Sequence, residues 1–513
     1  MGLINAWKGF WTSGEGFGGK LSPRKKPIRM YAGAATSRLN TDWMAAATSA
    51  DAEIKGSIKR LRQRSRQLVR DDPHARQAVR SITSNVIGDS GIKLQAHVRK
   101  YRVNTLDTKI NNNIEETWKR WGRYDSCHTA GRLCWKDIER LCCNSMIESG
   151  EVFVRMVKKP FGRSKIPFAL EILEADQLDD DYTGKSATNN TSWRMGVEVD
   201  QFMRPLNYAF LSKHPGDTPF ALTQVEDRHK IIPADEIIHL YMTDRPSQTR
   251  GVPWMASAIE SLHQLAGFRE SAVVRARASS ALMGFITSPE GELDQGGEVY
   301  DGDRVTSFSP GSFHYLQNGE NVVVPDMDSP HGEFEPFMRS MLRSMAAGIG
   351  LSYESLSRDY SQSNYSSSRL AMLEDRTQYK AIQNYFIENL HSRIYENWLQ
   401  MAVLSGELNL PNFDTDFEKY MKIHWMPRGW SFIDPLKEVN AAKEAVKAGF
   451  KTQAQVVAEQ GGDLEELLAE RKDEVDQAEQ LGLVFDSKLT IPTEQKEVSI
   501  DETPNPESNG GKT

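Results

Sequence analysis

The chain of 513 residues carries one segment whose spacing matches a phosphate-binding loop. Residues 14 to 20 read Gly-Glu-Gly-Phe-Gly-Gly-Lys and fit the pattern GxxxxGK. Such loops continue with a hydroxyl residue that binds the metal, but Leu21 stands there, and residues 6 to 12 do not form the buried strand that should precede the loop. The segment therefore favours a flexible arm over a nucleotide site.

Cysteines and a histidine could build a metal centre, and this chain holds all four of its cysteines in one short stretch. The stretch contains Cys127, His128, Cys134, Cys142 and Cys143. None of the intervals gives the CxxC spacing that presents two thiolates to one zinc ion. Buried thiols on a helix, in a reducing compartment, are the favoured interpretation.

Clustered carboxylates could hold the metal of a nuclease, and Asp176, Asp179, Asp180 and Asp181 form such a cluster. Consecutive aspartates next to Tyr182-Thr183-Gly184 are more typical of a solvated turn. HExxH and GxSxG motifs are absent from the sequence. We predict no catalytic residue, no metal site and no bound cofactor.

Arginines on two predicted helices are candidates for contact with phosphates or with acids of a neighbouring subunit, and they are Arg269, Arg275, Arg277, Arg339 and Arg343. A solvated helix face is the equally weighted alternative. Residues 357 to 368 are half serine and have no large aliphatic side chain, which predicts an exposed polar loop held between helices.

Charge is distributed unevenly along the chain. The formal net charge is -7, yet residues 1 to 102 hold 20 Lys and Arg against 7 Asp and Glu. The remaining residues therefore carry a net charge of -20, which differs from a uniformly basic nucleic-acid-binding protein. No apolar run approaches the ~18 to 20 residues of a membrane helix, so we expect a soluble protein that is not exported.

The elements that must position these residues follow from periodicity. Helices are predicted over residues 41 to 88, 133 to 150, 253 to 282, 336 to 349 and 369 to 403, with Pro253 as the first residue of the third. Strands are predicted at 152 to 157, 168 to 173, 195 to 199, 208 to 211, 236 to 241 and 422 to 425. Residues 283 to 332 are expected to form a compact β-rich insertion, and Asp434 and Thr452 to cap two short helices.

The order of these elements resembles the tailed-bacteriophage portal proteins, in particular the lambda-like portal family. The segments that carry the resemblance are Glu148-Ser149-Gly150-Glu151-Val152-Phe153-Val154, Gln248-Thr249-Arg250-Gly251, residues 346 to 354, residues 356 to 360, residues 364 to 369 and residues 436 to 449. They span about residues 60 to 465, and their joint order is more specific than any one of them.

The resemblance implies an α+β fold with a wing, a long-helix stem, a β-rich clip, a tunnel loop and an α-helical crown, assembled as a ring. By position, the parts would be a basic flexible arm (1–36), wing (37–250), first stem helix (251–282), clip (283–332), second stem helix (333–356), tunnel loop (357–368), long wing helix and return strand (369–430), crown (431–482) and disordered tail (483–513). The loop residues expected to face DNA are Arg358, Tyr360, Ser361, Gln362, Ser363, Asn364, Tyr365 and Ser366.

The function implied is that of a dodecameric ring at one capsid vertex, through which double-stranded DNA enters in packaging and leaves at infection. Implied partners are the large terminase subunit, which hydrolyses ATP, the major capsid and scaffolding proteins, and head-completion or tail connector proteins. The ring would reside in the virion, after assembly in the host cytoplasm. A metal-dependent DNA-acting enzyme and a non-portal capsid adaptor are the competing interpretations.

Overall fold

The computed structural model describes residues 46–101, 105–186, 190–220, 229–280 and 334–480, together with four short strands between residues 285 and 323. The predicted arm at 1–36, the phosphate-loop pattern at 14–20 and the tail at 483–513 lie outside the described residues. The described residues from Ala50 to Gln480 belong to one compact unit.

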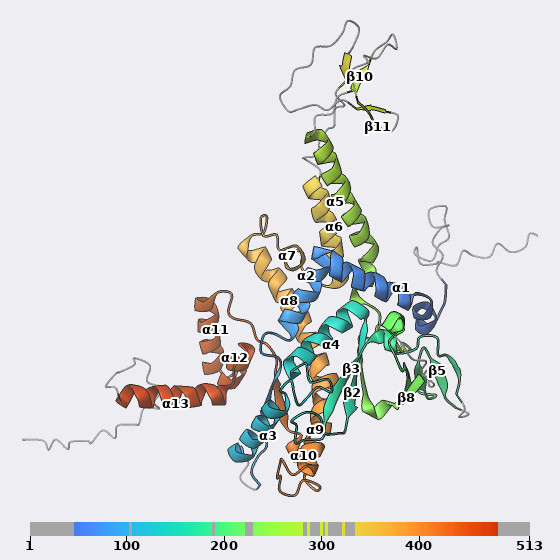
Figure 1. Ribbon diagram of the computed structural model, residues 1–513. Coiled ribbons are helices and arrows are strands. Elements are labelled where there is room, and N and C mark those ends of the chain that lie inside the picture. Colours follow the sequence, from blue (N-terminus) through green and yellow to red (C-terminus); the bar gives the residue numbers. More distant parts are fainter. Residues whose placement is uncertain are drawn as a thin grey trace, which may run out of the picture. The chain divides into compact units, whose positions relative to one another are not determined.

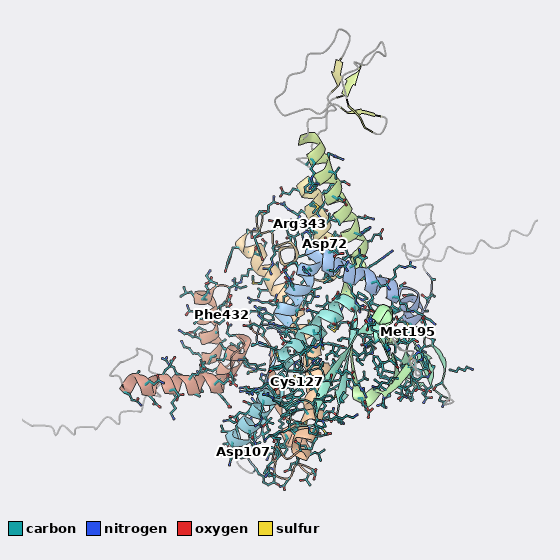
Figure 2. All side chains as sticks on the ribbon, in the orientation of Figure 1. Asp72, Asp107, Cys127, Met195, Arg343 and Phe432 are labelled. Carbon is teal, nitrogen blue, oxygen red and sulfur yellow. The ribbon has the colours of Figure 1, made fainter. Side chains whose placement is uncertain are left out.

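Two helices open the described part, α1 (Ala50–Asp71) and α2 (Pro73–Val86). Asp72 separates them and caps α2, because its side chain accepts hydrogen bonds from the backbone N–H groups of His74 and Ala75 at 2.8 and 3.0 Å (Figure 2). Pro73 suits the first position of α2, where no N–H partner is needed. The helical region predicted from residue 41 is thus two helices, and residues 46 to 49 precede them without helical structure.

A three-stranded antiparallel sheet lies next to the helix α4 (Trp135–Ser149). Its strand order is β3-β2-β9, with β2 (Glu151–Val157) between β3 (Ala169–Leu173) and β9 (Ile237–Tyr241). The predicted helix and strand around Gly150 are confirmed. In the register, Phe153 faces Leu173 on one side and His239 on the other.

A second sheet of five antiparallel strands has the sequential order β4-β5-β6-β7-β8. The strands are β4 (Gly184–Lys185), β5 (Ser192–Arg194), β6 (Val197–Val199), β7 (Pro205–Leu211) and β8 (His229–Pro233), and short 3-10 turns lie at η2 (Ala175–Gln177), η3 (Pro215–Phe220) and η4 (Ala234–Glu236). A separate small sheet pairs β1 (Lys93–Ala96) with β14 (Ile423–Met426), which confirms the strand predicted at 422 to 425.

Two helices, α5 (Ile259–Ser280) and α6 (Phe334–Ile349), run side by side (Figure 1). Phe268 of α5 packs on Phe334 and Phe337 of α6, with ring centroids 5.5 and 4.7 Å apart. The predicted helix start at Pro253 is wrong, because a 3-10 turn, η5 (Trp254–Ser257), comes first. This turn separates the start of α5 from Gly251, whose backbone packs closely against that of Gly150.

Four short strands lie between α5 and α6 in the chain. They are β10 (Phe285–Thr287), β11 (Glu298–Tyr300), β12 (Asp303–Val305) and β13 (Asn321–Val323). β10 pairs with β13 and β11 with β12, both antiparallel. These pairs agree with the predicted β character of the insertion, whose remaining residues lie outside the described part.

A short helix and a long one follow α6. These are α7 (Tyr353–Ser357) and α8 (Tyr365–Phe386), and a π-helical turn at η6 (Ile387–His391) connects α8 to α9 (Ser392–Leu404). Residues 365 to 368 were predicted as loop but form the first turn of α8, because Asn364 caps it by accepting from the Ser367 N–H at 2.8 Å. The loop itself is thus residues 358 to 364.

The helix α3 (Thr108–Trp121) lies between β1 and α4 in the chain. Four shorter helices close the described chain: α10 (Phe417–Tyr420), α11 (Pro435–Lys447), α12 (Gln453–Glu459) and α13 (Leu464–Gln480). Asp434 and Thr452 cap α11 and α12 as predicted. None of the helices that the structure describes is both long and apolar enough to cross a membrane.

The main core joins distant parts of the chain around an aromatic cluster. Trp118 of α3 contacts Trp135 of α4, Trp398 of α9 and Trp425 of β14, with centroid distances from 5.0 to 5.8 Å. The edge-to-face geometries add to the area that these large rings bury. The helix α9, which continues α8, is thereby packed against α3, α4 and β14.

Candidate functional site

A buried ion network lies where the chain passes from the strand β9 to the helix α5. Arg250 and Glu151 are both fully buried, and the Arg250 Nε and Nη2 atoms donate to Glu151 Oε1 at 2.9 and 2.6 Å. The Gly251 N–H donates to Glu151 Oε2 at 2.9 Å. Glu151 opens β2 and Arg250 precedes α5, so the pair ties the sheet to the segment that leads into α5.

Further charges complete this network. Arg62 of α1 donates to Glu151 at 3.0 Å and to Asp176 at 2.7 Å, and Arg250 also donates to Asp180. The carbonyl of Met195, labelled in Figure 2, accepts from Arg250 at 2.6 Å. We name the set Arg62, Arg66, Arg250, Glu151, Asp176 and Asp180 the stem-base network. It holds three guanidinium groups and three carboxylates, so its formal charges balance.

The protonation states in the stem-base network follow from burial and neighbouring charge. Burial alone would raise the pKa of Glu151, but Arg250, His239 and Arg62 outweigh that effect and hold the pKa well below its ordinary value. Burial lowers the pKa of His239, so its neutral ring donates from Nε2 to Glu151 Oε2 at 2.9 Å. Glu151 therefore remains a carboxylate that accepts from four residues.

Two glycines make the crossing at the stem base possible. Gly150 has φ +88°, and a Cβ there would lie 2.4 Å from the backbone carbon of Val252. A Cβ on Gly251 would lie 2.1 Å from the Gly150 oxygen. Two of the segments that carried the family resemblance, residues 148 to 154 and 248 to 251, thus contact each other here. Because about 100 positions separate them, the sequence alone could not show this contact.

The aspartate cluster at 176 to 181 is not the solvated turn that its composition suggested. Asp179 and Asp180 are 7% exposed, and Asp179 accepts from His229 Nε2 at 2.7 Å. Asp181 is exposed and pairs with Lys59 at 2.6 Å. The error arose because the partners of these aspartates lie 50 to 122 positions away in the sequence, so no local pattern reveals them.

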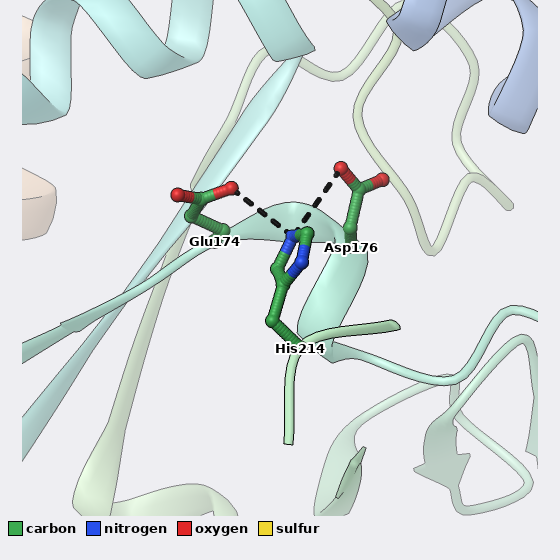
Figure 3. A group of neighbouring side chains, drawn as sticks. All are labelled: Glu174, Asp176 and His214. Carbon is green, nitrogen blue, oxygen red and sulfur yellow. Dashed lines mark ion pairs between the residues drawn. The ribbon is translucent and has the colours of Figure 1, made fainter. Parts of the chain in front are cut away.

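One group of described residues has the ligand types of a metal site, namely Glu174, Asp176 and His214 (Figure 3). His214 Nε2 lies 3.4 Å from Glu174 and 4.0 Å from Asp176. His214 Nδ1 accepts from the Gly216 N–H, so in the neutral ring Nε2 carries the proton and cannot bind a cation. Asp176 already accepts from Arg62 and Arg66, and this arrangement is an ion-pair cluster rather than a metal centre.

The cysteines are free thiols, as predicted. Cys142 and Cys143 are buried on α4, Cys127 is buried before it, and Cys134 is partly exposed at its amino terminus. Burial raises the pKa of Cys127 and Cys143 to about 12, so both are uncharged. Uncharged thiols neither bind metal nor attack substrates.

The loop of residues 358 to 364 is held by its own polar groups. Arg358 adopts φ +59° and ends α7, and the Ser361 N–H donates to Asp359 Oδ1 at 3.0 Å. The hydroxyl of Tyr353 donates to Asp359 Oδ2 at 2.8 Å. These hydrogen bonds, those from Ser361 first, hold the pKa of Asp359 at about 2. The predicted exposure is confirmed for Tyr360 and Tyr365, which are 55% and 58% exposed.

Two of the predicted stem arginines approach this loop from α6. Arg339 donates to Gln362, pairs with Glu335, and lies 3.9 Å from Asp359. Arg343 lies over the Tyr353 ring, 5.4 Å from its centroid. Of these two arginines, Arg339 contacts the loop itself, whereas Arg343 contacts Tyr353 of α7, the helix that precedes the loop.

The arginines predicted on α5 do not join them. Arg269 pairs with Asp72 at 2.6 Å and links α5 to the junction of α1 and α2. Arg275 and Arg277 are exposed, and neither has an ion pair within the described residues. Which partner these two arginines face stays a prediction.

The described elements come in the order expected of a portal-class protein: an α+β region, the long helix α5, an insertion with short strands, a second helix α6, a polar loop and the long helix α8. The model of the family described as phage portal protein, lambda family, matches residues 36–383. The chain belongs to this family and is a bacteriophage portal protein.

Curated relatives match nearly the whole chain. The chain is 28% identical over 497 residues to a probable portal protein of Halomonas phage phiHAP-1, covering 94% of each sequence. It is 24% identical to portal protein B of Escherichia phage lambda, covering 97% of this chain and 96% of the relative. The portal protein of Escherichia phage N15 is also 24% identical, with coverages of 91% and 90%.

Proposed function

We propose that this protein forms a dodecameric ring at one capsid vertex, with an axial channel through which double-stranded DNA enters during packaging and leaves at infection. The family membership over residues 36–383 carries the proposal. The terminase would dock on residues 283 to 332 and supply the ATP hydrolysis, and capsid, scaffolding and head-completion proteins would contact the ring. The chain itself would catalyse no reaction.

Exposed apolar side chains support assembly with other copies. Val273 and Val274 on α5 are 49% and 57% exposed, and Leu370 on α8 is 60% exposed. Leu436 and Phe450, in the proposed crown, are more exposed still. Large apolar side chains on several elements cost free energy in water, so we expect neighbouring subunits to cover them.

Charge supports weak contact with moving DNA. The residues after position 102 carry a net charge of -20. A channel lined by many cations would bind phosphates strongly through counterion release and would resist sliding. An acidic protein with a polar loop can instead exchange neutral hydrogen bonds with a passing backbone. A metal-dependent nuclease is disfavoured because Asp176, Asp179 and Asp180 are engaged in internal pairs.

The first prediction is ring assembly of the purified full-length protein. Electron microscopy and native mass spectrometry should show a closed ring with a central hole, because the exposed apolar faces need partners on both sides of each subunit. A stable monomer or dimer at micromolar concentration in every buffer would contradict the proposal. A small closed oligomer without a hole would favour the enzyme alternative.

The second prediction concerns the insertion. Deleting residues 291 to 303, which removes β11 and the first residue of β12, should leave ring formation intact but abolish terminase docking, since the insertion is the proposed docking surface. Co-sedimentation of rings with the large terminase subunit measures the effect. An equally long deletion of residues 501 to 513 is the control and should retain docking. Normal DNA packaging by rings with the first deletion would refute the assignment.

A further inference from the structure

A cleft of about 520 Å³ lies between the start of the loop, the helix α8 and the segment that follows β14. Its lining includes three arginines from these three elements, Arg358, Arg376 and Arg428. Two aromatic side chains, Tyr360 and Trp430, also line it. We call this the three-arginine cleft. Residues 70 positions apart in sequence form it, so no local pattern could predict it.

The arginine side chains are anchored at the cleft by neutral groups. Arg376 donates from Nη2 to the Ser431 carbonyl at 3.3 Å, and its guanidinium carbon lies 5.7 Å from the centroid of the Trp430 ring. Arg428 donates to the carbonyl of Ser84. The Nε atom of Arg376 is buried and has no hydrogen-bond partner among the described residues. A buried donor of this kind costs free energy unless a ligand satisfies it.

The positive charge in the cleft is not neutralised by described carboxylates. None of the three arginines has an ion pair within the described part of the chain, whereas Arg250, Arg269 and Arg339 each have one. Asp375, the carboxylate in the lining, accepts from the Ser352 N–H and from the Ser352 and Ser355 hydroxyls at 2.6 to 2.9 Å.

One further carboxylate approaches from α11. Glu438 attracts Arg376 electrostatically, but its side chain is bound to Arg369 at 3.3 Å. The cleft thus presents three guanidinium groups, and the one carboxylate in its lining is already saturated with hydrogen bonds. An anion with several acceptor oxygens is the ligand that this arrangement fits.

We propose that the three-arginine cleft binds a phosphate group of a nucleic acid or a nucleotide. Guanidinium groups bind phosphate oxygens in pairs, and the rings of Tyr360 and Trp430 can contact the attached sugar or base. The volume suffices for a nucleotide-sized ligand. When DNA is the source of the phosphate, the inference rests on the proposed function, since the cleft adjoins the loop assigned to the channel.

The test measures binding of three probes to full-length protein by calorimetry: pyrophosphate, ATP and a blunt ten-base-pair duplex. The cleft variant combines Arg358→Asn, Arg376→Gln and Arg428→Gln; Asn is chosen because it tolerates the positive φ of residue 358. The control variant combines Arg60→Gln, Arg76→Gln and Arg80→Gln, which removes three exposed charges from α1 and α2. A second variant, Arg376→Lys with Arg428→Lys, keeps the charge.

The cleft variant should bind the probes at least about tenfold more weakly, because charge-assisted hydrogen bonds are lost. The control should change binding by less than about twofold, and the lysine variant should recover part of the loss. A loss confined to pyrophosphate and ATP identifies a nucleotide as the source. A loss for the duplex, with a salt slope smaller by about 0.9 for each phosphate released, identifies DNA.

Three results would overturn the inference: equal losses in the cleft and control variants, no binding of any probe by the wild-type protein, or rings that dissociate in the cleft variant while probe binding persists. The last result would mean that an acidic segment of a second copy fills the cleft. Thermal unfolding of each variant verifies folding, and the lysine variant decides the question if the glutamine variant does not fold. Ring formation is scored separately by microscopy, so failure of the proposed function is recognised independently.

Discussion

Replacing Glu151 by glutamine should destabilise the folded protein by about 3–5 kcal/mol, or prevent its folding altogether. The carboxylate accepts from Arg62, Arg250, His239 and the Gly251 N–H. The amide of glutamine would turn a donor toward these donors and leave two buried guanidinium groups with less negative charge. Chemical denaturation, followed by far-ultraviolet circular dichroism, measures the free energy of unfolding.

Glu171→Gln provides the matched control for this prediction. Glu171 lies on β3, beside β2, and pairs with Arg155 at 3.3 Å with 39% of its side chain exposed. A pair so exposed to solvent should contribute less than about 1 kcal/mol. Similar unfolding free energies for the two variants would show that the stem-base network does not hold the fold together.

The ionisation of Glu151 also determines how the free energy of unfolding changes with pH. Because the pKa of Glu151 is lower in the folded than in the unfolded protein, its contribution is complete above the unfolded pKa of about 4.3 and is lost as the pH falls below it. Glu151→Gln, if it folds, should therefore lose less stability than wild type when acidified below about pH 4.

The sequence predicted well those features that depend on neighbouring residues. The caps at Asp434 and Thr452, the strand after Gly150 and the polar loop all follow from local residue types, and the structure has them. The helix after the loop was predicted to begin at residue 369, but Asn364 caps it and Tyr365, four residues before position 369, is its first residue. Consecutive serines generally favour loops over helices, because their hydroxyl groups compete for backbone hydrogen bonds. Here the cap at Asn364 starts the helix despite the serines that follow it.

Features that depend on distant residues could not be predicted. Arg250 and Glu151 are separated by 99 positions, and the buried Asp180 accepts from Arg250, which lies 70 positions away. A run of aspartates looks the same whether its cations are solvent ions or arginines from elsewhere in the fold. The family resemblance supplied the order of elements, but the resemblance contained no information on which charges meet.

The stem-base network and the loop contacts have a shared mechanical consequence. The network fixes the segment before α5 to the strand β2, and Arg339 of α6 reaches Gln362 in the loop. A force on the loop would thus pass through α6, which packs on α5, to the sheet that contains β2. The proposed contact of the loop with moving DNA would require such support, because an unsupported loop would be displaced instead of guiding the duplex.

Lysines at positions 361, 363 and 366 should slow DNA packaging by roughly tenfold at low ionic strength, with recovery at high salt. Ser361 and Ser366 are exposed, and the backbone N–H of residue 361, which bonds Asp359, is kept in the substitution. Asn364 is left unchanged because it caps α8. In a ring, every subunit would add three cations near the duplex, and each phosphate contact would have to break before the DNA advances.

The triple substitution of the same serines by glutamine is the control, because glutamine has similar length without charge. Rings of the glutamine variant should package DNA at wild-type velocity. Neither the lysine nor the glutamine variant should change the free energy of unfolding by more than about 0.5 kcal/mol per exposed position. The measurement is packaging velocity and final DNA length at low and high salt. If the lysine and glutamine rings package equally fast at low salt, the loop does not face DNA, and residues 358 to 364 would be an ordinary surface connection between α7 and α8.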